Sequence, residues 1–261
     1  MAPFVFFIFL FFSSASAACF NCTKHSKAAY FAQSSGLISG ACGYGPLALK
    51  FYGGHVAAAG DTLFNSGEGC GGCFQIRCKN SNLCNKKGAT IVLTDLHSDK
   101  AYTTDFVLSI KAFRAMALPG KDKQLLQLGI ADVEYTRTPC VYKRQNLALQ
   151  VEKFSHYPNH LAIKIIYQGG LTTIVGVEVA SVDNPSWISM SRNYGAVWDT
   201  NKAPNGKLMF RFIIYSGYDA QHFYVNEVLP ANWTPGVIYN STVQIDNISL
   251  VDTCPDPCPW V

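Results

Sequence analysis

Residues 69–78 read GCGGCFQIRC and join a glycine-rich turn to a short run of alternating side chains. Such a run, bounded by turn residues, is typical of a β-strand, here Cys73–Cys78. The stretch from Gly67 to Gly72 also fits the pattern GxGxxG. No strand–turn–helix unit surrounds it and a cysteine lies inside it, so we exclude a dinucleotide site. The segment predicts a β protein with disulfide-linked turns.

The ten cysteines are concentrated in the first half of the chain. Six are Cys42, Cys70, Cys73, Cys78, Cys84 and Cys140, while Cys19, Cys22, Cys254 and Cys258 lie near the two ends. A zinc site would need four thiolates or imidazoles in a tetrahedron, and no histidines accompany this run. In a secreted chain an even number of cysteines indicates disulfides, although the sequence alone leaves their pairing open. We therefore expect no metal.

The N-terminus has the pattern of a secretory signal. Residues Phe4–Phe12 are continuously apolar, and Ala15–Ala17 form the small-residue site that signal peptidase accepts. The apolar run is too short to cross a bilayer as a helix. We predict a cleaved signal peptide at residues 1–17, an extracellular protein, and no membrane partner after cleavage. The net charge of +4 is mild, which argues against a nucleic-acid partner.

Strand and turn signals divide the mature chain into two domains. Over residues 39–142, short strand-like runs alternate with glycine-rich turns, and Ser109 can cap one amphipathic helix. Residues 143–156 are mostly polar, and we predict a linker there. Over residues 157–246, alternating segments recur with turns between them, as in a β-sandwich. Residues 247–261 are rich in proline and are predicted to form an irregular C-terminal extension.

Several enzyme signatures are missing from the sequence. It contains no GxSxG and no HExxH, so the usual serine esterase and metalloprotease sites are excluded, and we expect no cofactor. The N-glycosylation sequon occurs at Asn21, Asn232, Asn240 and Asn247. Each of these asparagines would have to be exposed to carry a glycan.

A series of motifs occurs in the order found in one plant family. They are GACGYG at 40–45, GCGGCFQIRC at 69–78, VLTD at 92–95, LSIKAF at 108–113, YTRTPC at 135–140, LAIK at 161–164, WISMSRNYGAVW at 187–198 and LPANW at 229–233. Over nearly the whole mature chain the sequence resembles the plant expansin superfamily. The Cys19/Cys22 pair, the run DFVLS at 105–109 and the cysteine-bearing tail make it most similar to the expansin-like A subfamily.

This resemblance implies an all-β fold. A six-stranded double-psi β-barrel, related to family-45 endoglucanases, would be followed by an immunoglobulin-like β-sandwich that binds polysaccharide. The resemblance also implies the disulfides Cys42–Cys70, Cys73–Cys140 and Cys78–Cys84. Cys19 would pair with Cys22, or these two would pair with the C-terminal cysteines.

The barrel lacks an acid where the resemblance would place one. Cleavage of a glycosidic bond normally needs two carboxyl groups, one of which protonates the leaving oxygen. Expansins keep that acid in the motif HFDLS; here Val107 occupies its position and Asp105 replaces the histidine. Asp105 is displaced by about 6.6 Å along a strand and would need a bulge to re-aim it. We expect no catalytic residue and no hydrolysis.

A groove in the barrel could still bind sugar chains without a proton donor. The candidate groove residues are Asp95, His97, Asp105 and Tyr30. Asp95 matches the family's Thr-Asp motif and could accept hydrogen bonds from sugar hydroxyls or serve a turn. His97 stands where the family often has a tyrosine, and Tyr30 lies near the place of its Thr-x-Tyr motif.

The second domain is expected to present aromatic rings that stack on sugars. Tyr194 precedes Gly-Ala-x-Trp and keeps one ring of the family's platform, whereas His160 replaces the second and Tyr157 could compensate. The remaining large rings, Trp187, Trp198 and Trp233, are expected in the core between the sheets. Arg192 is expected to be a solvated side chain.

Three functions remain open. The first is a monomeric, non-catalytic wall protein that binds cell-wall polysaccharide, either cellulose or a matrix glucan, and alters contacts between polymers. The second is an endo-β-glucanase with Asp105 as a relocated acid. The third is a structural or signalling glycoprotein without affinity for glycans.

Overall fold

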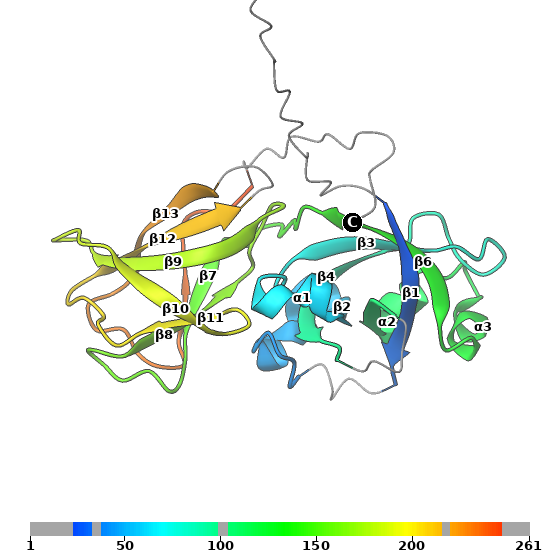
Figure 1. The fold of residues 1–261 in the computed structure, drawn as a ribbon, viewed down its shortest axis with the longest axis horizontal. Helices are drawn as coiled ribbons and strands as arrows, with labels where there is room; N and C mark the ends of the chain where they lie inside the picture. The colour runs from blue at the N-terminus through cyan, green and yellow to red at the C-terminus, as the bar shows by residue number, and fades with distance from the viewer. Residues whose placement is uncertain (1–22, 33–37, 99–103, 216–219, 247–261) are drawn as a thin grey trace, which may run out of the picture.

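The computed structural model describes residues 23–32, 38–98, 104–215 and 220–246, which form two β domains (Figure 1). Within these ranges, no helix has the length and apolarity needed to cross a membrane. The predicted signal peptide and C-terminal extension lie outside the described residues.

The first domain, called the barrel domain below, is a closed six-stranded barrel. Its strands are β1 (Lys24–Phe31), β2 (Val56–Ala59), β3 (Cys73–Cys78), β4 (Ala89–Leu96), β5 (Phe106–Ser109) and β6 (Ala131–Thr138). Around the barrel the order is β1-β5-β2-β4-β3-β6, with β1–β5 and β2–β4 parallel and the other pairs antiparallel. The strand predicted at Cys73–Cys78 is therefore confirmed.

Short helices cover the barrel. They are α1 (Asp61–Phe64), α2 (Ile110–Ala115), α3 (Asp122–Gln127) and the 3-10 segments Gly45–Gly54 and Asn65–Gly67. Ser109 begins α2 as predicted, because its hydroxyl accepts a hydrogen bond from Ala112 N at 3.2 Å and satisfies one of the free N–H groups there. Phe74, Phe106 and Phe113 are buried in the core of this domain.

The three disulfides that the resemblance implied are confirmed: Cys42–Cys70, Cys73–Cys140 and Cys78–Cys84. They close sequence separations of 28, 67 and 6 residues, respectively. The two longer ones constrain the unfolded chain most. The cysteines near both ends of the chain lie outside the described residues.

The second domain, called the sandwich domain, contains eight strands. They are β7 (Ala148–Val151), β8 (Leu161–Ile166), β9 (Thr173–Ser181), β10 (Ile188–Tyr194), β11 (Val197–Thr200), β12 (Leu208–Tyr215), β13 (Ala220–Leu229) and β14 (Ile238–Asn240). Their order is β13-β12-β9-β10-β11-β8-β7-β14. Ile188–Met190 of β10 pair with β9 and the rest of β10 pairs with β11, so one strand joins two layers. Ile163 and Trp198 from one layer meet Phe212 from the other in a single core.

The predicted linker at 143–156 differs from the structure, because it contains a strand of the sandwich. Ala148–Val151 form β7, which pairs with both β8 and β14. Leu147, Leu149 and Val151 alternate with other residues and are fully buried. Polar residues dominate the composition of residues 143–156, and the buried alternation covers only a few positions. The composition of the segment therefore predicted a linker and not a strand.

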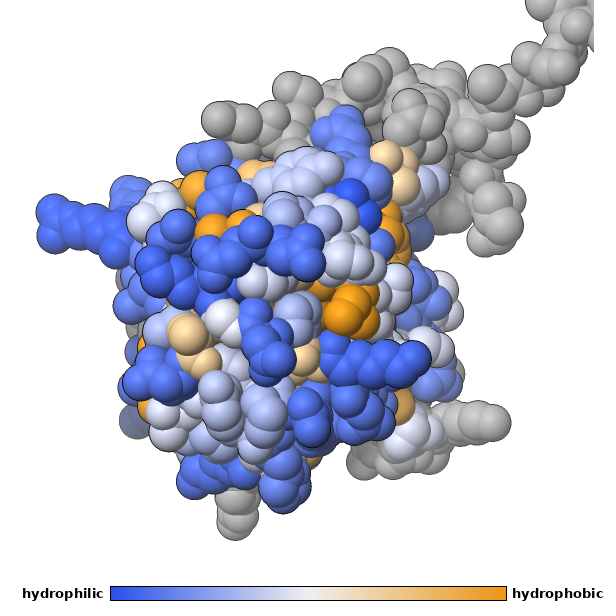
Figure 2. Space-filling model, turned by 90° about the vertical axis from the view of Figure 1, so that its left-hand side faces the viewer, coloured by the Kyte–Doolittle hydropathy of each residue, from blue (hydrophilic) through white to orange (hydrophobic). Residues whose placement is uncertain are grey.

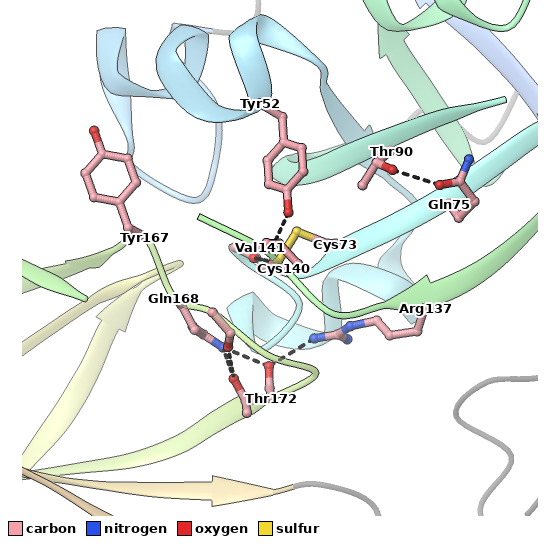
Figure 3. The surroundings of a disulfide bond; sticks show 12 residues. Tyr52, Cys73, Gln75, Thr90, Arg137, Cys140, Val141, Tyr167, Gln168 and Thr172 are labelled. Carbon is pink, nitrogen blue, oxygen red and sulfur yellow. Dashed lines mark hydrogen bonds between the residues drawn. A yellow bond between two sulfur atoms is a disulfide. The ribbon is translucent and has the colours of Figure 1, made fainter. Parts of the chain in front are cut away.

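The two domains share a tightly packed junction near the Cys73–Cys140 disulfide (Figure 3). Cys140 and Gly170 exchange backbone hydrogen bonds at 2.9 and 3.0 Å. Arg137 Nη2 donates to the carbonyl of Thr172 at 3.1 Å, and the hydroxyl of Tyr52 accepts from Val141 N. Three sandwich residues, Ala148, Ile166 and Ala196, belong to the core cluster of the barrel domain. The core of the barrel domain therefore extends across the junction to these three residues of the sandwich domain.

Candidate functional site

Strand register places Val107 and Asp95 in one row across the barrel. Ala29 pairs with Val107, Val107 with Ala58, and Ala58 with Asp95. Paired residues on neighbouring strands point to the same face, and each step spans about 4.8 Å. We call these four residues the Val107 row. Asp95 thus lies on the same face as Val107 but two strands away, at roughly 10 Å.

The surroundings of Val107, where the resemblance implies an acid, are apolar in three dimensions as well as in sequence. Val107 is only 8% exposed, and its row neighbours on both sides are alanines. None of these three side chains can donate or accept a proton. The Val107 row therefore offers Asp95 as its one ionisable side chain.

Asp105 is engaged elsewhere. The hydroxyl of Tyr135 donates to Asp105 Oδ2 at 3.4 Å, and the ring of Tyr135 packs on Phe106 with centroids 4.9 Å apart. Burial raises the pKa of Tyr135, and the neighbouring charge of Asp105 raises it further. The carboxylate of Asp105 is thus directed to a tyrosine of β6 rather than into the Val107 row.

Asp95 anchors a loop. Its Oδ1 atom accepts hydrogen bonds from Ala41 N at 2.6 Å and from Leu96 N at 2.8 Å. A Cβ on Gly40 would lie 2.6 Å from the carbonyl oxygen of Thr94, so the loop touches β4 closely. The side chain of Asp95 is half-buried. Among the described residues, no group is shown to form a hydrogen bond with its second carboxylate oxygen, Oδ2.

Two other groove candidates have different positions. Tyr30 pairs with Leu108 instead of Val107, its ring lies 4.9 Å from that of Phe113, and its hydroxyl donates to Leu126 O at 3.1 Å. Tyr30 thus faces the helices rather than the Val107 row, and its role as a groove residue stays a prediction. His97 is half-buried just after β4, where its backbone nitrogen donates to Ala59 O at 2.7 Å.

Tyr194 stands at the junction of the domains. It ends β10, is 42% exposed, and its ring rests on the barrel domain at Gly43, where a Cβ would lie only 2.5 Å from the ring's Cε2. Partial burial raises the pKa of its phenol, and the charge of Glu152 adds to the effect. Glu152 itself forms a buried ion pair with Lys164 at 2.6 Å. An exposed ring is therefore held next to the loop that Asp95 anchors.

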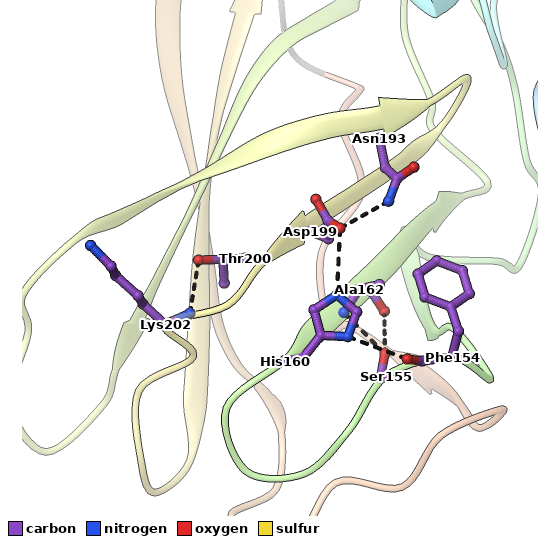
Figure 4. A network of polar contacts seen from close by, with 8 residues as sticks. All are labelled: Phe154, Ser155, His160, Ala162, Asn193, Asp199, Thr200 and Lys202. Atoms are coloured by element: carbon purple, nitrogen blue, oxygen red, sulfur yellow. Dashed lines mark hydrogen bonds and ion pairs between the residues drawn. The ribbon is translucent and has the colours of Figure 1, made fainter.

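His160 belongs to a polar network on the same layer as Tyr194 (Figure 4). Its Nε2 lies 3.4 Å from Asp199 Oδ2, and its Nδ1 lies 3.2 Å from the carbonyl of Phe154. The amide of Asn193 donates to the same Asp199 oxygen at 2.8 Å. The network engages both ring nitrogens of His160 and fixes the orientation of the imidazole.

Tyr157 is 56% exposed, and its ring meets the edge of Trp233 at 5.2 Å between centroids. Trp198 and Trp233 are 4% and 3% exposed, as expected for core residues. Trp187 differs from the expectation, since it is half-buried on the outer face of the other layer and packs on Arg211, 4.6 Å from the ring centroid.

Arg192 is not the solvated side chain that the sequence predicted. Its guanidinium lies 4.2 Å from the ring centroid of Trp198 and donates to three backbone carbonyls, one of them in the barrel domain. Burial lowers its pKa. The glycines of GACGYG were the one sequence signal for this junction, because repeated glycine often marks close backbone approach.

The end of the sandwich domain that faces away from the barrel is mostly hydrophilic, with small separate hydrophobic patches (Figure 2). Among the described residues, no cluster of histidine, cysteine, aspartate or glutamate could hold a metal ion. The candidate site therefore consists of the Val107 row, the loop at Gly40–Gly45, Tyr194 and the His160 network.

Comparison with known proteins agrees with this architecture. Residues 147–230 match the family model described as the expansin C-terminal domain, and residues 56–135 match the double-psi barrel model described as lytic transglycolase. A crystal structure of an expansin from Clavibacter michiganensis superimposes with a TM-score of 0.63 at 18% identity, covering 85% of this chain and 98% of that one. A variant of that expansin, in complex with cellohexaose, gives the same TM-score at 17% identity.

The chain is 52% identical to expansin-like A3 of Arabidopsis thaliana over 95% of its length and 94% of that protein. It is 49% identical to expansin-like A2 of the same plant, with 98% and 96% covered. It is 42% identical to expansin-like A3 of Oryza sativa subsp. japonica, with 92% and 88% covered. This chain therefore belongs to the expansin superfamily and, within it, to the expansin-like A proteins.

Proposed function

We propose that this protein is a secreted component of the plant cell wall that binds an extended polysaccharide chain and alters contacts between wall polymers without cutting them. The observation that carries the proposal is the exposed ring of Tyr194, held on Gly43 where the two domains meet. An aromatic ring fixed on a rigid element can stack on the apolar face of a sugar. The polysaccharides that we propose as ligands are cellulose and matrix glucans.

Three further features support polysaccharide binding. The second carboxylate oxygen of Asp95, to which no described residue is shown to bond, can accept hydrogen bonds from sugar hydroxyls, and it lies beside the loop on which Tyr194 rests. The Asn193–Asp199–His160 network lies on the Tyr194 layer and fixes the imidazole of His160, whose ring we propose as a second contact for sugar. A structurally similar expansin forms a complex with cellohexaose, which makes β-linked glucan the first ligand class to test.

Hydrolysis is not part of the proposal. Both common mechanisms of glycoside cleavage need two carboxyl groups facing the scissile bond. Val107 has no carboxyl group, and the carboxylate of Asp105 accepts a hydrogen bond from the hydroxyl of Tyr135. Release of reducing ends from soluble β-glucans, abolished by Asp105→Asn, would show instead that the protein is an endo-β-glucanase with a relocated acid.

An extracellular location fits the same proposal. The N-terminal sequence has the pattern of a signal peptide, and three disulfides join the described cysteines, which suits an oxidising compartment. Asn232 and Asn240 are both exposed and are the sequons we propose for glycosylation, while Asn21 and Asn247 lie outside the described residues. Treatment of the secreted protein with a peptide N-glycosidase would report the number of occupied sites.

The deciding experiment is retention of purified protein on insoluble cellulose and matrix glucans, compared between wild type and Tyr194→Ala. Tyr224→Ala is the matched control, because Tyr224 is an equally exposed tyrosine (49%) that pairs with Arg211 on the other layer of the sandwich. Tyr194→Ala should lower retention and Tyr224→Ala should not. A folded protein that is retained on none of these polymers would favour a structural or signalling glycoprotein.

A further inference from the structure

The turn that carries Tyr194 is enclosed by backbone of the barrel domain. Ala196 N donates to the carbonyl of Cys42 at 3.1 Å. A Cβ on Gly195 would lie 2.5 Å from Cys42 Cα, and a Cβ on Gly67 would lie 2.9 Å from Gly195 Cα. The turn between β10 and β11 therefore lies between two backbone segments, one at Cys42 and one at Gly67, with no room for a side chain on either glycine.

The Cys42–Cys70 disulfide ties these two segments together. Its Cα atoms are 5.5 Å apart, and Cys70 N also donates to the carbonyl of Gly67 at 3.2 Å. The same loop carries Gly43, on which the ring of Tyr194 rests. The disulfide thus fixes the spacing of the walls around a turn that belongs to the other domain.

Arg192 closes this arrangement from the sandwich side. Its Nη1 donates to the carbonyl of Gly67 at 3.2 Å and to that of Gly195 at 2.6 Å. Its Nη2 donates to Ile174 O at 2.6 Å, which anchors the guanidinium in its own domain. One half-buried guanidinium therefore joins the Gly67 segment of the barrel domain, the enclosed turn and strand β9.

We propose that the Cys42–Cys70 disulfide, with Arg192 and Gly43, is a clamp that positions the ring of Tyr194 for polysaccharide. These are positioning groups, because none of them needs to touch the sugar. The inference rests on the proposed function of Tyr194. It adds that a disulfide of the barrel domain sets the position of a sugar-binding ring of the sandwich domain. Cys78–Cys84 lies at the opposite end of β3 from the junction, roughly 16 Å along the strand, and has no such role.

The test compares two pairs of variants carrying a fluorine label on the ring of Tyr194, observed by ¹⁹F NMR. The first pair is the double variant Cys42→Ser/Cys70→Ser with Cys78→Ser/Cys84→Ser as its control. The second pair, which keeps every disulfide, is Gly43→Ala with Gly45→Ala as its control. Both glycines have positive φ (77° and 57°), so both substitutions strain the backbone, but a Cβ meets the Tyr194 ring only at Gly43.

Cys42→Ser/Cys70→Ser and Gly43→Ala should each shift the fluorine resonance and weaken binding of cellohexaose by roughly two- to tenfold, the range expected for loss of one aromatic stack. The two controls should leave both readouts near wild type. An unchanged resonance in Gly43→Ala overturns the clamp, whatever the binding does. A shifted resonance in a protein that never binds any glucan supports the clamp and rejects the proposed function instead.

Discussion

The Oδ1 atom of Asp95 lies 2.6 Å from the backbone nitrogen of Ala41, and this bond ties the end of the Val107 row to the loop beneath Tyr194. One carboxylate oxygen therefore anchors the loop, and among the described residues no group is shown to bond the other oxygen. The aspartate of the Thr-Asp motif thus has a structural task, beside the sugar-binding role that we propose for it.

Replacement of Asp95 should separate these tasks. Asp95→Ala removes the acceptor for Ala41 N and Leu96 N and should lower the free energy of unfolding by about 1.5–3 kcal/mol. Asp95→Asn keeps one oxygen and should cost less. Urea unfolding of both variants measures the difference; equal losses would contradict the anchoring role.

Restoring a carboxyl group at Val107 should not restore hydrolysis. Val107→Asp places an acid between Ala29 and Ala58 in a buried position, which should destabilise the fold by about 3–5 kcal/mol at neutral pH. The other carboxyl group of the Val107 row, that of Asp95, accepts hydrogen bonds from Ala41 N and Leu96 N, so we expect it to anchor its loop rather than to activate water. Unfolding and reducing-end assays on this variant, with Val107→Ala as the control for lost volume, check both statements, and measurable cleavage would contradict the second.

The tryptophans should differ in their contribution to stability. Trp233→Ala removes a buried ring from the sandwich core and should cost about 3–5 kcal/mol. Trp187→Ala removes a half-buried ring from Arg211 and should cost about 1 kcal/mol. Denaturant unfolding ranks the two, and a larger loss for Trp187→Ala would show that the outer aromatic contact matters more than its exposure suggests.

Stability should fall on mild acidification, in part because of His55. Burial, and secondarily the charge of Lys111, hold the pKa of His55 below its ordinary value of 6.5. Between that lowered value and 6.5 the unfolded chain binds more protons than the folded one, so stability is full above pH 6.5 and declines as the pH falls through this window. His55→Gln should flatten this part of the profile, measured by urea unfolding at several pH values. A slope equal to that of wild type would rule out the contribution of His55.

The order of the motifs and cysteines along the chain allowed much of the fold to be predicted. The glycine-flanked alternation at Cys73–Cys78 indicated a strand, and the family motifs implied the barrel, the sandwich and the three disulfides, all of which the structure contains. The strand Ala148–Val151 was missed, because four alternating residues beside a polar stretch carry little periodicity.

The sequence by itself determined that a valine, Val107, stands where the resemblance implies an acid, because the identity of a residue does not depend on folding. Only the tertiary structure decided what the polar and aromatic candidates do. Tyr30 faces helices, Arg192 bonds backbone carbonyls across the junction, and Tyr194 rests on a glycine of the other domain. Such roles are set by which distant backbone segments approach a side chain, and that proximity arises from packing of the two domains rather than from any local pattern of residues.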